Sequence, residues 1–167
     1  GFSTAVGGLQ ETFMAFQVES VQPRAAQLWR LDMDRAYTAG SSLGGLIAYR
    51  LAFAYPDVYK GAASLSGAFW PGQDTGTAMR DVLADTGRVP VALYMDHGGT
   101  AEDGGDGYED NLELRDLLVE AGWSRDDSPD CAAGPQALCY YWDEGATHDE
   151  LAWRDRSWRF LRYFFAE

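Results

Sequence analysis

The feature that most constrains the fold is a sharp glycine-rich turn between two apolar segments. Residues 36–48 read AYTAGSSLGGLIA, a short predicted strand that leads through Gly-x-Ser-x-Gly into an alanine- and leucine-rich predicted helix. In that setting the motif exposes a nucleophilic serine, here Ser42, at the top of a sheet. The turn strains the serine backbone, and we expect glycine at positions 40 and 44 because side chains there would collide.

The same turn has a simpler reading, in which Ser42 only caps the helix that follows it. The flanking strand and helix favour the nucleophile instead. The helix N-terminus adds a positive dipole end, and the N–H of Leu43 is then placed to face a developing oxyanion. The motif therefore predicts both a nucleophile and one oxyanion donor.

The composition indicates a packed globular protein. The chain has 167 residues, 46% hydrophobic and 14% aromatic, which fits a single domain over residues 1–167 with a real core. The net charge of -13 argues against nucleic acid or an anionic membrane surface as a partner, since both bind basic patches. No apolar run reaches the roughly 18 residues that a transmembrane helix needs.

The chain contains two cysteines, Cys131 and Cys139, on either side of a loop that holds Gly134 and Pro135. A disulfide between them would close that loop. They belong to no Cys/His group with the spacing of a zinc site, so we expect no metal and no other cofactor. A disulfide would favour a location outside the cytoplasm.

Strand-like and helix-like segments alternate along most of the chain. Strands are predicted before Ser42 and near 61–67, 90–95 and 137–142, and helices after Ser42, near 78–86, from about 108 to 122 and after residue 148, with two earlier helices near 9–16 and 23–31. This alternation predicts an α/β fold with a mostly parallel sheet and helices on both faces. Because chemistry in such sheets lies beyond the carboxyl ends of the strands, Ser42, the loop 96–103 and His148 are expected at one edge.

A serine nucleophile needs a base, and the chain offers two histidines, His97 and His148. In α/β-hydrolases the triad follows the order serine, acid, histidine, which selects His148 as the base. His97 lies near the start of the acidic loop 96–103, so it would come before most of the candidate acids instead of after them. A structural histidine is the alternative for either residue.

The acid is expected on the loop after the strongest strand. Glu102, Asp103 and Asp96 are the candidates in that order of preference, because Gly98 and Gly99 let the chain turn back before Glu102. A solvated carboxylate is the alternative for each of them. Asp149 and Glu150 are set aside, since the side chains of immediate neighbours of His148 rarely face it.

Aromatic residues near the elbow are candidates for a substrate pocket. Phe69 and Trp70 follow a predicted strand that ends beside the elbow, so they are placed to bind an acyl or aromatic group. Core packing explains them equally well. Trp153, shortly after His148, is interpreted as a core residue.

Several of these segments resemble one family. RAYTAGSSLGG (35–45), YPDVY (55–59) and SLSGAFW (64–70) resemble the putative esterase, or esterase D-like, family of the α/β-hydrolase superfamily, and the resemblance spans nearly the whole chain. It implies Ser42 as nucleophile, His148 as base and the Leu43 N–H in the oxyanion hole. GTAE (99–102) resembles the family's glycine-x-x-acid turn and supports Glu102, and GATH (145–148) with Trp153 resembles its histidine turn.

The resemblance implies a serine carboxylic-ester hydrolase that works through an acyl-enzyme, like feruloyl, acetyl-xylan and siderophore esterases. The expected substrate is a small-molecule or carbohydrate-linked ester. Acyl transfer to an alcohol by the same residues and a catalytically silent binding module are the alternatives.

One departure from the family concerns the position of the elbow. The family places several strands and an oxyanion loop before it, whereas Ser42 comes early in this chain. We therefore expect residues 1–167 to be the C-terminal portion of a hydrolase domain, with a separate N-terminal segment as the partner that supplies the second oxyanion donor.

Overall fold

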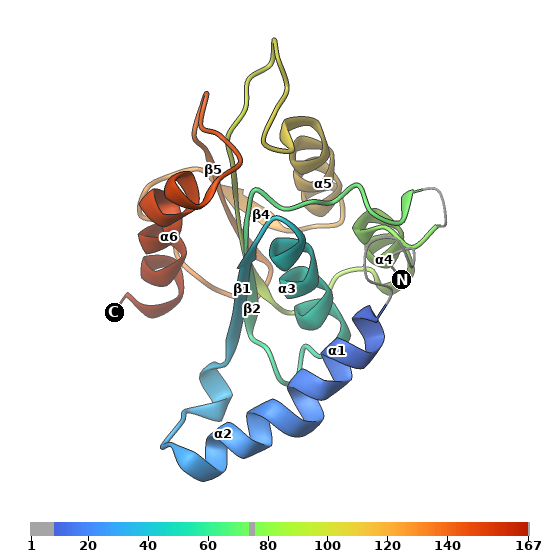
Figure 1. Cartoon of the computed structure of the whole chain (residues 1–167), viewed down its shortest axis with the longest axis vertical. Helices are drawn as coiled ribbons and strands as arrows, with labels where there is room; N and C mark the ends of the chain where they lie inside the picture. Colours follow the sequence, from blue (N-terminus) through green and yellow to red (C-terminus); the bar gives the residue numbers. More distant parts are fainter. Residues whose placement is uncertain (1–8, 74–75, 167) are drawn as a thin grey trace.

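The computed structural model describes residues 9–73 and 76–166. Its helices and strands are, in chain order, α1 (Gln10–Phe16), the π-helical η2 (Gln17–Val21), α2 (Gln22–Leu28), the 3-10 turn η3 (Met33–Arg35), β1 (Tyr37–Ser41), α3 (Leu43–Ala54), β2 (Gly61–Leu65), α4 (Met79–Thr86), β3 (Ala92–His97), α5 (Tyr108–Glu120), β4 (Ser124–Asp126), β5 (Ala137–Trp142) and α6 (Glu150–Phe165). Figure 1 shows the sheet standing between α6 on one side and α3, α4 and α5 on the other. The predicted α/β arrangement is thereby confirmed.

The five strands form one sheet in the order β1-β2-β3-β5-β4, and every neighbouring pair is parallel. The sequence predicted four of them. It missed β4 because the three residues of that strand are polar and exposed, and so carry neither an apolar run nor alternation.

The strand register brings the carboxyl ends of four strands to one level. Ser41 of β1 pairs with Leu65 of β2, Leu65 pairs with Asp96 of β3, and Asp96 pairs with Tyr141 of β5. The loops that follow these strands therefore start side by side at one edge of the sheet.

The inner strands β2 and β3 are buried on both faces, as strands of a parallel sheet between helices should be. Successive residues of β3 belong to opposite cores: Leu93 and Met95 pack in the larger cluster with α3 and α5, while Tyr94 packs with Tyr163 and Phe164 of α6. α3 lies in the larger cluster and is buried over most of its circumference, as befits a helix packed centrally on the sheet.

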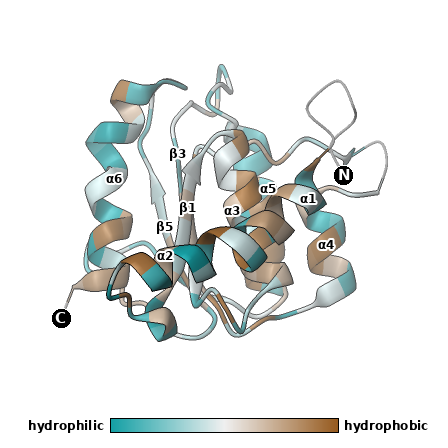
Figure 2. Cartoon of the chain, turned by 60° about the horizontal axis from the view of Figure 1, so that its bottom comes forward, coloured by the Kyte–Doolittle hydropathy of each residue, from teal (hydrophilic) through white to brown (hydrophobic). Residues whose placement is uncertain are grey.

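The first helical segments form one run from Gln10 to Leu28 rather than two separate helices. Pro23 lies in the first turn of α2, just after the π-helical segment, and the wider π turn leaves room for the proline ring, which has no N–H to donate to the preceding turn. Figure 2 shows hydrophobic positions along this run. Several of its large apolar side chains and those of the following loop are exposed: Leu9, Phe13, Phe16, Val21, Leu28, Trp29, Leu31 and Met33.

Two further findings bear on the chain as a whole. Cys131 and Cys139 form the expected disulfide, with Cα atoms 5.7 Å apart, and so tie the loop before β5 to that strand. Over residues 9–73 and 76–166, every helix is too short or too polar to span a bilayer.

Candidate active site

Ser42 occupies the sharp turn between β1 and α3. Its backbone angles, φ 54° and ψ -123°, lie in a region that residues other than glycine rarely adopt. The turn is held by the Ser42 N–H, which donates to the Leu65 carbonyl at 3.0 Å, and by the Ser42 carbonyl, which accepts from the Ala68 N–H at 3.0 Å. The strained serine predicted for the motif is therefore present.

The glycines of the turn differ in how much space a side chain would have at each position. A Cβ at Gly40 would lie 2.4 Å from the Gly44 carbonyl carbon and oxygen, and one at Gly45 would lie 2.4 Å from Ser64 Oγ. A Cβ at Gly44 would meet no described atom within 4 Å. The expected collision is thus confirmed at Gly40 and wrong at Gly44, and the close approach of the helix to β2 falls on Gly45 instead.

His148 reaches Ser42 although β5 and β1 are separated by two strands. The turn before His148 runs beside the segment after β3: the Gly99 N–H donates to the Ala146 carbonyl at 2.9 Å, and the Gly145 N–H donates to the Gly99 carbonyl at 3.0 Å. This pairing carries the histidine across the edge of the sheet. His148 Nε2 lies 2.9 Å from Ser42 Oγ, and the imidazole is 39% exposed.

The carboxylate beside the histidine belongs to Asp106. Its Oδ1 lies 2.7 Å from His148 Nδ1, and its side chain is completely buried. With the proton on Nδ1 directed to Asp106, Nε2 is free to accept the Ser42 hydroxyl proton. The other carboxylate oxygen, Oδ2, accepts from Ser66 Oγ at 2.6 Å and from the Gly98 N–H.

This arrangement corrects the predicted acid. The loop after β3 closes on itself through reciprocal hydrogen bonds between Thr100 and Gly104, at 2.8 and 2.9 Å, so Glu102 and Asp103 protrude from its tip into solvent. The chain returns to the sheet only at Asp106, between glycines with positive φ. A GGDG run (104–107) directly before a helix was the available signal, and the glycine-x-x-acid likeness at 99–102 pointed elsewhere.

Asp96, the third candidate, is buried below the site rather than beside the histidine. Its Oδ2 accepts from Tyr94 Oη at 2.9 Å, and its Oδ1 lies 3.1 Å from Nε of Arg156. Burial raises the pKa of Asp96 to about 7, while the Arg156 charge and the Tyr94 hydrogen bond oppose that rise. Asp96 is therefore part of the support of the site.

His97 is a buried structural histidine, in line with the choice against it. Its Nδ1 lies 2.8 Å from the Gly98 carbonyl and its Nε2 lies 2.7 Å from Tyr140 Oη, so both ring nitrogens are occupied. Burial lowers the pKa of His97, which keeps the ring neutral.

Of the two aromatic residues predicted to line a substrate pocket, one lies in the core and the other lies at the surface. Phe69 is 4% exposed and packs against Tyr49, with ring centroids 5.5 Å apart, so the interpretation as a pocket wall is replaced by core packing. Trp70 is exposed, and its role in binding stays a prediction. Trp153 is only partly buried and lies edge-on to His148 with ring centroids 5.0 Å apart, so the interpretation of Trp153 as core is wrong.

Comparisons with known proteins identify a family for this chain. The sequence model of the family described as Putative esterase matches residues 7–157. A search of curated proteins gives no match.

Solved structures of esterases and of a serine hydrolase share the fold at low sequence identity. The enterobactin esterase FES from Shigella flexneri is 20% identical with a TM-score of 0.63, and the match covers 85% of this chain and 35% of that one. A ferulic acid esterase is 17% identical with a TM-score of 0.66, covering 90% and 59%. FphF, a fluorophosphonate-binding serine hydrolase from Staphylococcus aureus, is 16% identical with a TM-score of 0.60, covering 85% and 61%. The matched part is about a third to three fifths of each of these chains.

Proposed function

Because this chain belongs to the putative esterase family, we propose that it is a serine carboxylic-ester hydrolase that works through an acyl-enzyme. The observation that carries the proposal is the continuous contact from Ser42 Oγ to His148 Nε2 and from His148 Nδ1 to Asp106 Oδ1, at 2.9 and 2.7 Å. These distances and this order of groups are those of a nucleophile, a base and an orienting acid.

In the proposed reaction, Ser42 Oγ attacks the ester carbonyl carbon while His148 Nε2 takes the hydroxyl proton. The buried Asp106 carboxylate stabilises the imidazolium that forms and holds the ring in place. His148 then returns the proton to the departing alcohol, which leaves Ser42 acylated. A water molecule that His148 activates hydrolyses the acyl-enzyme and restores the serine.

Charge on the carbonyl oxygen would be stabilised at the start of α3. Leu43 is the first residue of that helix, so its N–H has no carbonyl of a preceding turn as partner. This N–H and the positive end of the helix dipole favour an anion next to Ser42. We assign Leu43 as one oxyanion donor.

The second oxyanion donor is assigned to a further segment of the same hydrolase that pairs with β1. Among the strands of the described residues β1 pairs with β2 alone, so its other edge is free. Beside that edge lies an open hollow of about 460 Å³ whose lining includes Leu31, Met33, Tyr37 and Phe165. A strand laid on β1 would cover these apolar side chains, and the partial coverage of the similar structures supports such a segment.

The substrate is proposed to be a small-molecule or carbohydrate-linked ester. The site is open, since His148 and Leu43 are each more than a third exposed, and an ester attached to a larger group fits such a site. The similar solved structures include a ferulic acid esterase, and because ferulic acid is an aromatic acid, aromatic acyl groups are the first to test.

The proposal is tested by hydrolysis of 4-nitrophenyl acetate and methyl ferulate by this chain and by a version extended at its amino end. Ser42→Ala and His148→Gln serve as controls. Hydrolysis that both variants abolish supports the esterase, and activity only in the extended version also supports the additional segment. Turnover that appears only with an added alcohol acceptor would indicate an acyltransferase. If no turnover is seen under any of these conditions, the remaining interpretation is a catalytically silent binding module.

A further inference from the structure

The carboxylate of Asp106 rests on a buried polar cluster that the reaction itself does not use. Ser66, which follows β2 at the level of Ser42, places its Oγ 2.6 Å from Asp106 Oδ2 and has no exposed surface. Trp153 and Arg156 of α6 both reach the same hydroxyl: Trp153 Nε1 lies 3.0 Å and Arg156 Nη2 2.6 Å from Ser66 Oγ.

These contacts determine where the Ser66 proton points. A serine hydroxyl has one proton and two acceptor lone pairs. The indole N–H of Trp153 and the guanidinium N–H of Arg156 can only donate, so they occupy both lone pairs. The single proton of Ser66 is therefore left to donate to Asp106 Oδ2, and Asp106 Oδ1 stays available to His148.

Arg156 adds a positive charge to the same cluster. Its side chain is 2% exposed, and its Nη2 lies 3.6 Å from Asp106 Oδ2 while its Nε lies 3.1 Å from Asp96 Oδ1. A third carboxylate, that of Asp143, lies 3.6 Å from Nη1. A buried guanidinium attracts the carboxylates around it, so Arg156 helps to hold the Asp106 carboxylate in position beside Ser66.

The base is tied to the same helix. α6 begins directly after His148, and Asp149 caps it by accepting from the Leu151 N–H at 2.9 Å and from the Ala152 N–H at 3.0 Å. Trp153 then lies edge-on to the imidazole, with planes at 87°. Trp153 thus contacts both the histidine and the serine that holds Asp106.

We propose that Ser66, Trp153 and Arg156 are positioning residues that fix Asp106 and His148 in the geometry needed to activate Ser42. The proposal rests on the proposed function insofar as Ser42 and His148 are the reacting pair. In this proposal each of the three residues acts through the acid or the base. They link the end of β2 and one helix face to the reacting groups.

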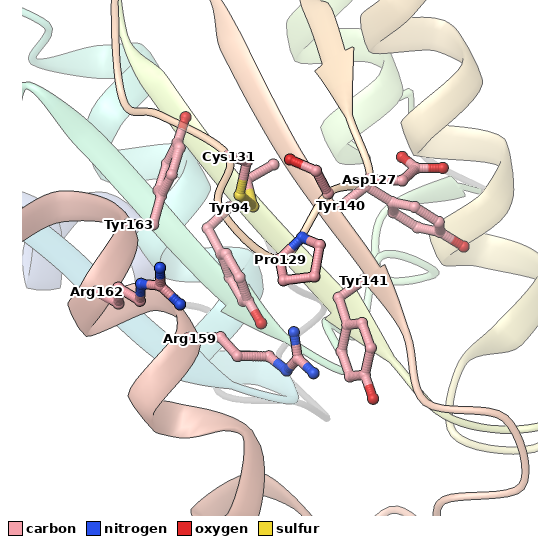
Figure 3. Close-up of a pocket in the computed structure, with 11 residues that line it drawn as sticks. Tyr94, Asp127, Pro129, Cys131, Tyr140, Tyr141, Arg159, Arg162 and Tyr163 are labelled. Atoms are coloured by element: carbon pink, nitrogen blue, oxygen red, sulfur yellow. A yellow bond between two sulfur atoms is a disulfide. The ribbon is translucent and has the colours of Figure 1, made fainter. Parts of the chain in front are cut away.

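The test compares Ser66→Ala and Trp153→Phe with Arg159→Met as a matched control. Arg159 lies in the same helix, but its guanidinium packs over the Tyr141 ring at 3.5 Å from the centroid, near the small cavity of Figure 3 and away from the Asp106 cluster. For each variant we would measure kcat and KM for 4-nitrophenyl acetate. The downfield proton resonance of His148 Nδ1–H, recorded by NMR without substrate, gives a second readout.

Loss of the Ser66 hydroxyl should lower kcat about 10- to 100-fold, the effect of one hydrogen bond to a charged group, with KM nearly unchanged. The Nδ1–H resonance should shift or broaden, and Arg159→Met should leave both readouts unchanged. Trp153→Phe keeps an aromatic ring beside His148 but removes the donor, so a smaller loss of kcat with the same spectral change is expected. If Ser66→Ala does not fold, the result for Trp153→Phe alone decides whether the positioning network exists.

The two proposals fail in different ways. An active wild type whose kcat and Nδ1–H resonance survive both substitutions would overturn the positioning network and leave the esterase intact. A wild type that is inactive both as this chain and in the extended version, but whose Nδ1–H resonance still responds to Ser66→Ala, would overturn the esterase and keep the network.

Discussion

Asp106 Oδ1 lies 2.7 Å from His148 Nδ1, although the two residues follow different strands and are 42 positions apart. The contact forms because the turn before His148 pairs with the Gly98–Gly99 segment, while Asp106 returns to that segment through the N–H of Gly98. The same short backbone segment, Gly98–Gly99, thus positions both the base and the acid.

This contact predicts opposite results for two carboxylates of one loop. Asp106→Asn should lower kcat/KM by about 10³- to 10⁴-fold, because the amide cannot hold the imidazole in the required tautomer or stabilise its charge. Glu102→Gln should stay within about twofold, since Glu102 is exposed at the tip of the loop. Steady-state hydrolysis of 4-nitrophenyl acetate measures both. A strong effect of Glu102→Gln with a mild effect of Asp106→Asn would instead identify Glu102 as the acid.

The elbow predicts that its two motif glycines are not equivalent. Gly40→Ala should destabilise the fold by about 3 kcal/mol, because the new methyl group overlaps backbone atoms of Gly44 that cannot move aside. Gly44→Ala should change the free energy of unfolding by less than about 1 kcal/mol, in the stabilising direction expected for alanine in a helix. Urea denaturation of the two variants checks this, and equal losses would contradict it.

Gly98 is predicted to be essential for the site because two segments approach it closely. A Cβ there would lie 2.1 Å from the Ala146 carbonyl oxygen and 2.8 Å from Asp106 Oδ2. Gly98→Ala should displace both and lower kcat about 100-fold, the usual cost of about 1 Å of misplacement. Gly134→Ala, where a Cβ would meet no described atom within 4 Å, is the matched control for the assay.

The buried Asp96 predicts a pH dependence of stability. Burial raises the pKa of Asp96 from 3.8 to about 7, so between these values the folded protein holds a proton that the unfolded chain has released. The contribution of Asp96 to the free energy of unfolding is therefore present below about pH 4 and is lost as the pH rises through 7. The difference in stability between wild type and Asp96→Asn should show this slope in urea titrations from pH 4 to 8. A difference that rises with pH would contradict it.

The part of the fold that sequence predicted best is the part set by short-range patterns. Ser42, the strand before it and the helix after it follow from a turn whose sterics involve only neighbouring residues. β5 was predicted at its observed bounds from its apolar run. Chain order then separated His148 from His97, because the order of triad residues does not depend on loop shape.

The acid could not be found in the same way because it depends on how a loop folds. The two glycines before it and the glycine-x-x-acid likeness favoured Glu102, whereas the bridge between Thr100 and Gly104 places Glu102 in an exposed loop tip. The hydrogen bond from Arg156 to Ser66, which supports Asp106, could not be predicted from local sequence patterns either, since it joins residues 90 positions apart. Trp153 appeared as core for the same reason.

The most direct test of the account is the site of labelling by a fluorophosphonate probe, which reacts with an activated serine. Mass spectrometry would locate the adduct on this chain and on its amino-terminally extended version, with Ser42→Ala and Asp106→Asn as comparisons. The account predicts an adduct on Ser42 alone, lost in Ser42→Ala and formed far more slowly in Asp106→Asn. An adduct on another residue, labelling at an equal rate in Asp106→Asn, or no adduct on either version would contradict it.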